Sequence, residues 1–190
     1  MKRTPTDLLL TGSLLVAPLI YLLADSLYAA RGWDDPDAGA VHVLGAVAYT
    51  FVLVRIASWS TGWLAAGTLF AGLVGAAGNV AYGFNTIHVS LGGIDLVDTG
   101  GPGAIIKPLG LFFPLSLLLA AAVLARLGTR VTAAIVAVAA VAWPVAHIAD
   151  IAWLAVTVNA LLVLSLVPLG WTSVTGSAPT GSMLSPERSG

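Results

Sequence analysis

The stretch from Val131 to Gly170 most constrains what this chain can fold into, because it is almost entirely apolar. At about 1.5 Å per residue, a single helix over this stretch would be about 60 Å long, whereas the hydrocarbon core of a bilayer is about 30 Å thick. The chain must therefore turn, and we expect the turn between Pro144 and Asp150. Proline removes a backbone donor there, and the carboxylate favours water. The stretch predicts two membrane spans, 131–146 and 151–169.

Four earlier segments are also long and apolar enough to cross a bilayer, and they lie at about residues 8–28, 41–56, 62–84 and 104–127. Hydrophobic residues make up 58% of the chain and charged residues 9%, against roughly 45–50% and about 25% in soluble domains. We therefore predict an all-α polytopic bundle of about six transmembrane helices over residues 1–171. Residues 172–190 are rich in Ser, Thr, Gly and Pro and are predicted to form a disordered cytoplasmic tail.

The positions of the basic residues predict the orientation of this bundle. Only Arg31 and Lys107 fall on the side opposite the termini, and the termini share their side with Lys2, Arg3, Arg55, Arg126, Arg130 and Arg188. Because cytoplasmic loops carry an excess of Lys and Arg, both termini are predicted to be cytoplasmic and the protein to lie in the plasma membrane. A net charge of −1 and the scattered basic residues exclude a nucleic-acid partner. The chain has no cysteine, which excludes thiolate chemistry.

Small residues recur at intervals of four in the third segment, at Gly67, Ala71 and Gly75, and Asn79 follows. Such a stripe lets helix backbones approach closely in a membrane. We therefore expect span 62–84 to be central in the bundle. The same face offers a contact surface for a partner membrane protein or a second copy of the chain. The glycine-rich segment 85–103 is predicted to be the longest loop.

All three histidines and most aspartates fall on the predicted outer side of the membrane. They define a candidate outer polar pocket of Asp25, His42, His88, His147 and Asp150. Neutral imidazoles from three spans would suit a divalent metal such as zinc, so His42, His88 and His147 form a candidate metal site. No local metal-binding motif is present. The same residues also fit interfacial positions that contact headgroups and water, or a wet pocket for a small solute.

Three polar residues interrupt the apolar spans themselves. Asp25 shares a helical face with Tyr21 and Tyr28, and an intramembrane carboxylate predicts a functional site. The alternative is an aspartate near the helix end, solvated or paired with Lys107. The amides of Asn79 and Asn159 are predicted near the membrane midplane, where they either join helices by hydrogen bonds or line a solute path.

These patterns favour a small non-enzymatic accessory or interaction subunit with an outward-facing polar pocket. A small-solute or ion transporter, or its membrane-embedded binding subunit, is the second hypothesis, and an outer-leaflet, metal-dependent lipid enzyme is the third. The sequence decides neither whether the protein is an enzyme nor which cofactor it uses, beyond the candidate divalent metal.

Overall fold

The computed structural model describes residues 4–175 and is all-helical over that range. The long helices are α1 (Pro5–Arg31), α2 (Pro36–Ala57), α3 (Gly62–Ser90), α4 (Ile106–Arg126), α5 (Arg130–Ile148) and α6 (Ala152–Thr175), and a short 3₁₀ helix, η1 (Pro102–Ile105), precedes α4. Six helices in the described range, α4 counted together with η1, are long and apolar enough to cross a membrane. The predicted all-α architecture with six long apolar helices is therefore confirmed.

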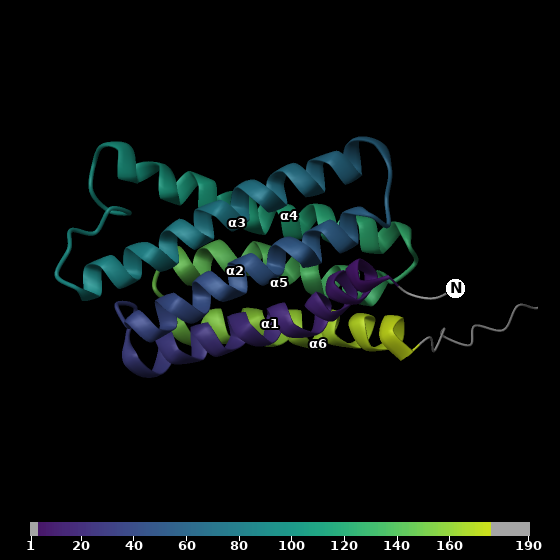
Figure 1. The fold of residues 1–190 in the computed structure, drawn as a ribbon, viewed down its shortest axis with the longest axis horizontal. Coiled ribbons are helices and arrows are strands. Elements are labelled where there is room, and N and C mark those ends of the chain that lie inside the picture. The colour runs from purple at the N-terminus through teal and green to yellow at the C-terminus, as the bar shows by residue number, and fades with distance from the viewer. Residues whose placement is uncertain (1–3, 176–190) are drawn as a thin grey trace, which may run out of the picture.

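The six helices form a closed ring in which each packs against its neighbour in the chain and α6 returns to α1 (Figure 1). Because the helices alternate in direction, the start of α1 and the end of α6 lie at the same end of the bundle. We call this the terminal end. The opposite end carries the loops 32–35, 91–101 and 149–151, and we call it the Trp33 end.

Local sequence explains where the first two helices begin and end. The Thr4 hydroxyl accepts a hydrogen bond from the Asp7 backbone N–H at 3.1 Å, which caps α1. At the other end of α1, Gly32 adopts a φ of 100°, a conformation that favours glycine. The Asp35 carboxylate then accepts from the Ala38 N–H at 2.8 Å and caps α2. The turn is short, so α1 and α2 lie side by side.

The two largest differences from the predicted boundaries are at the ends of α3 and α6. α3 continues to Ser90, beyond the predicted end at residue 84, because no proline or glycine cluster interrupts it before residue 92. α6 continues to Thr175, so residues 172–175 of the predicted tail are helical. The rest of that tail, residues 176–190, lies outside the described residues.

The small-residue face of α3 packs against α4. A Cβ atom added at Gly75 would lie 2.3 Å from the backbone nitrogen of Phe113, and one added at Gly78 would lie 2.3 Å from that of Gly110. The expected close approach of backbones is thus present. The expected central position is not, because α3 contacts only α2 and α4 among the long helices. Its opposite face exposes apolar side chains, including Leu73.

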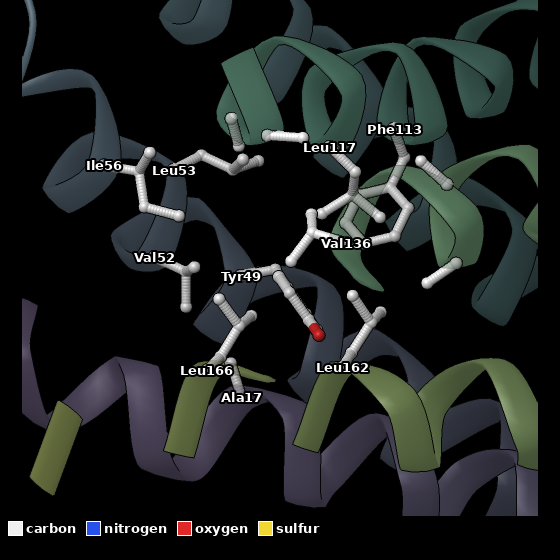
Figure 2. Packing of buried hydrophobic residues seen from close by; sticks show 14 of the residues in the cluster. Ala17, Tyr49, Val52, Leu53, Ile56, Phe113, Leu117, Val136, Leu162 and Leu166 are labelled. Atoms are coloured by element: carbon white, nitrogen blue, oxygen red, sulfur yellow. The ribbon is translucent and has the colours of Figure 1, made fainter. Parts of the chain in front are cut away.

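The interior divides into an apolar half and a polar half. Toward the terminal end it is filled by aliphatic side chains around Tyr49, which points from α2 toward Leu162 of α6 (Figure 2). Toward the Trp33 end the buried residues include Asp25, His42, Asn79 and Asn159. Large apolar side chains are exposed along the outside of the bundle, including Leu19, Leu44 and Leu164. This arrangement is the reverse of the distribution in soluble proteins and is expected where lipid surrounds the bundle.

A candidate polar site at the Trp33 end

Asp25 of α1 lies at the centre of the buried polar half and is fully buried. Its carboxylate oxygen Oδ2 accepts a hydrogen bond from the Asn159 side-chain amide of α6 at 2.5 Å. The same oxygen lies 3.4 Å from Nε2 of His147, near the end of α5. One carboxylate oxygen therefore joins three helices, which the ring closure of α6 onto α1 brings together.

A backbone contact fixes the orientation of His147. Its Nδ1 atom lies 3.0 Å from the carbonyl oxygen of Trp143, one helical turn earlier. A carbonyl oxygen only accepts hydrogen bonds, so Nδ1 carries a proton and Nε2 is the atom that faces Asp25. The imidazole also stacks on the Trp143 indole with ring centroids 4.1 Å apart.

His42 and Asn79 form a second buried pair, between α2 and α3. The Asn79 amide donates to the Gly75 carbonyl at 2.8 Å, which turns its oxygen toward His42 Nε2 at 3.2 Å. That oxygen is an acceptor, so His42 carries its proton on Nε2. We call Asp25, His42, Asn79, His147 and Asn159 the polar cluster.

Aromatic rings in contact with one another form a closed circuit around the Trp33 half of the bundle. Along the circuit, neighbouring ring centroids are 4.1 to 6.0 Å apart, in the order His42, Tyr21, Phe113, Trp143, His147, Trp33, Tyr28 and back to His42. Ring pairs at such separations attract one another. The circuit fixes both histidines, so their positions do not depend on the polar contacts alone.

A cleft of about 180 Å³ leads from the Trp33 end down to this cluster. Asn79 and His147 line it, and Trp33, Tyr82 and Trp143 contribute aromatic surface. Its charged lining residues are Asp34, Asp95, Asp98, Asp150 and Lys107. Lys107 is paired with Asp98, whereas no ion-pair partner for Asp34 or Asp150 is present among residues 4–175. The cleft is therefore acidic and partly aromatic.

Several buried polar atoms in this half lack a hydrogen-bond partner within the described part of the chain. They are the hydroxyl of Tyr21, Oδ1 of Asp25, Nδ1 of His42, Nε2 of His147 and Oδ1 of Asn159. Buried polar atoms in native proteins are almost always paired with protein groups or water. Water or a polar ligand is thus expected inside this half of the bundle.

The structure brings together most of the residues that the sequence singled out. Asp25, His42, His147, Asn79 and Asn159 form the polar cluster, and Asp150 lies at the mouth of the cleft. Each asparagine makes the predicted hydrogen bond between helices, and only Asn79 also lines the cleft.

Two predicted partnerships are absent. Lys107 pairs with Asp98 of the loop instead of Asp25. His88 is exposed, and its ring packs against Gly93 of the loop. No group of three or more histidine or acidic side chains within residues 4–175 is placed to hold a metal ion, so the arrangement gives the His42, His88 and His147 metal site no support.

The aromatic and loop residues of the site were not predicted from the sequence. Trp33, Tyr82 and Trp143 line the cleft, and the Asn85 amide holds the loop by donating to Asp95 at 2.9 Å. The spacing of Trp143 and His147, four residues apart on one helix, is a local signal for their contact. By the same rule, Tyr82 lies beside Asn79, three residues earlier, and beside Asn85, three residues later.

Comparison with protein-family models, curated proteins and solved structures finds no match for this chain.

Proposed function

We propose that this chain is an integral membrane protein that binds a small organic cation in the cleft at the Trp33 end. The observation that supports this proposal is the lining of the cleft, which combines aromatic faces with carboxylates that have no ion-pair partner within residues 4–175. Carboxylates attract a cation at long range, and the faces of Trp and Tyr bind it through their quadrupoles at about 0.5–2 kcal/mol each. The cleft is smaller than the roughly 300–1,000 Å³ of sites for drug-sized ligands, which favours an alkylammonium ion of a few carbons.

The Lys and Arg distribution supports a cytoplasmic location for both termini in the plasma membrane. The Trp33 end then faces outside, and the cleft takes its solute from there. The aliphatic packing around Tyr49 fills the other half of the bundle, so the proposal is binding from one side. Binding also agrees better with the packing than an interaction subunit does, because α4 already covers the small-residue face of α3.

Isothermal titration of the purified protein with tetramethylammonium tests the proposal, with tert-butyl alcohol as an uncharged probe of similar shape. We expect the cation to bind and the alcohol not to bind. Asp34→Asn and Asp150→Asn should each weaken binding about 1.5- to 5-fold, as expected for exposed charges. Trp33→Leu should weaken it more than Trp33→Phe, because only phenylalanine keeps a ring face.

Asp37→Asn is the matched control. Asp37 is an exposed carboxylate at the same end, but it pairs with Arg31 at 2.9 Å and does not line the cleft. Its substitution should leave the affinity unchanged. Equal binding of the two probes, or equal effects of the Asp34, Asp150 and Asp37 substitutions, would contradict the proposal.

A further inference from the structure

We infer that Asp25 and His147 hold one proton between them and release it to the cleft when a cation enters. The first half of this inference rests on the geometry of the pair alone. The second half, the exchange, rests on the proposed function. Together they would make the protein a proton-coupled binder of cations.

The proton count follows from the donors and acceptors that the pair presents. The backbone contact to Trp143 places the proton of a neutral His147 on Nδ1, which leaves a lone pair on Nε2. That lone pair would face a carboxylate oxygen at 3.4 Å, with two acceptors opposed and no proton between them. One added proton removes the conflict, whether it resides on Nε2 or on Oδ2.

The net charge of the buried pair also indicates one added proton. Asp25 is fully buried, and a buried carboxylate needs a compensating charge. The arginines and lysine that form ion pairs within residues 4–175 pair elsewhere, Arg31 with Asp35 and Asp37, Arg55 with Asp7, and Lys107 with Asp98. A pair with no extra proton would carry an uncompensated negative charge, and one with two would carry an uncompensated positive charge. With one proton the pair is neutral.

The remaining titratable groups around the pair do not supply this charge. They are Tyr21 and Tyr28 on α1, His42 and Tyr49 on α2, Tyr82 on α3, and Asp150 in the loop after α5. The tyrosines are neutral donors or acceptors. His42 is already committed to Asn79 at 3.2 Å, and Asp150 is exposed at the mouth of the cleft.

His147 connects this proton to the cleft, because it both lines the cleft and faces Asp25. A cation bound beside the protonated pair would face either a positive imidazolium or a neutral pair that supplies no negative charge, in a site where little water screens it. Release of the proton to water in the cleft leaves an ionised Asp25 and a neutral His147. The pair then carries one negative charge opposite the bound cation, so the total charge of the site is unchanged by the exchange.

Two measurements on the full-length protein near neutral pH test the inference. Without a cation, ¹⁵N NMR of His147, assigned by its loss in His147→Gln, reports whether the imidazole is cationic. The infrared carboxylic-acid band that disappears in Asp25→Asn reports whether Asp25 is protonated. We expect one of these two signals but not both. A neutral imidazole with an ionised carboxylate, or a cationic imidazole with a protonated carboxyl, would overturn the inference.

With tetramethylammonium, titration in two buffers of different ionisation enthalpy gives the number of protons released per cation bound. We expect about one for the unmodified protein and for the control Asp37→Asn, and none for Asp25→Asn or His147→Gln. Binding without proton release would overturn the exchange and leave the proposed function intact. If no cation binds, the proposed function and the exchange fail together, and the spectroscopic count still decides whether the pair holds a proton.

Discussion

Both contacts to Asp25 reach the same carboxylate oxygen, and this asymmetry determines what each substitution there should do. Asn159 donates to Oδ2 at 2.5 Å, whereas Oδ1 has no partner among residues 4–175. An asparagine at this position could keep its oxygen in the place of Oδ2 and still accept the hydrogen bond from Asn159. An alanine would remove from both neighbours the oxygen that they share, and Asn159 would keep only the longer contact of its amide to the Ala155 carbonyl at 3.4 Å.

Asp25→Ala should therefore destabilise the bundle more than Asp25→Asn does. Each buried polar group left without a partner costs about 1–3 kcal/mol, so we expect a loss of about 2–4 kcal/mol for alanine and less than about 1.5 kcal/mol for asparagine. Thermal unfolding in detergent, followed by circular dichroism, measures the difference. Equal midpoints for the two variants would show that the contacts to Asn159 and His147 do not stabilise the fold.

The sequence predicted the residues of the polar cluster better than it predicted which residues contact one another. Asp25, Asn79 and Asn159 stand out because polar residues within apolar spans are rare. The partner of Asp25 is Asn159, on the last helix of the described chain, and only the closure of the ring makes them neighbours. The sequence also predicts Lys107 as an alternative partner of Asp25, but Lys107 pairs with Asp98 of the loop.

At the scale of the helices, α3 and α4 pack through glycine rather than through interlocking side chains. The sequence stripe at Gly67, Ala71 and Gly75 predicted a close approach of two backbones. It did not identify the opposing helix, since small residues show where a helix can be approached and nothing about what approaches it. The contact extends to Gly78, outside the four-residue repeat, where α4 also presents a glycine, Gly110.

This packing predicts different effects for two glycine substitutions on α3. Gly78→Ala would place a Cβ 2.3 Å from the Gly110 nitrogen, whereas at Gly67 the nearest atom is a Leu119 methyl at 3.6 Å. Overpacking against backbone costs about 1–3 kcal/mol, so Gly78→Ala should lower the unfolding midpoint in detergent. Gly67→Ala should leave it equal or higher, because alanine favours helix by about 1 kcal/mol over glycine. A Gly78→Ala variant as stable as Gly67→Ala would contradict the close contact.

For the molecule as a whole, hydropathy predicted the number of long helices but not the order in which they surround one another. The number follows from segment length against bilayer thickness, which is a local property of the sequence. The ring depends on contacts between helices, and the sequence pattern placed α3 at its centre although it lies on the perimeter. Likewise, the three histidines were expected to converge because they share one side, yet His88 points to the loop while His42 and His147 face inward.

Single-cysteine labelling can test the orientation in the membrane. Because the sequence contains no cysteine, an introduced cysteine is the one thiol of this chain that can be labelled. Asp34 at the Trp33 end and Thr61 at the terminal end are both exposed loop residues. The excess of Lys and Arg at the terminal end predicts that this end faces the cytoplasm. An impermeant maleimide applied to intact cells should therefore label Asp34→Cys and not Thr61→Cys, and permeabilised cells should show both. Labelling of Thr61→Cys alone in intact cells would reverse the orientation and make the cleft open to the cytoplasm, where the cation would then have to be supplied.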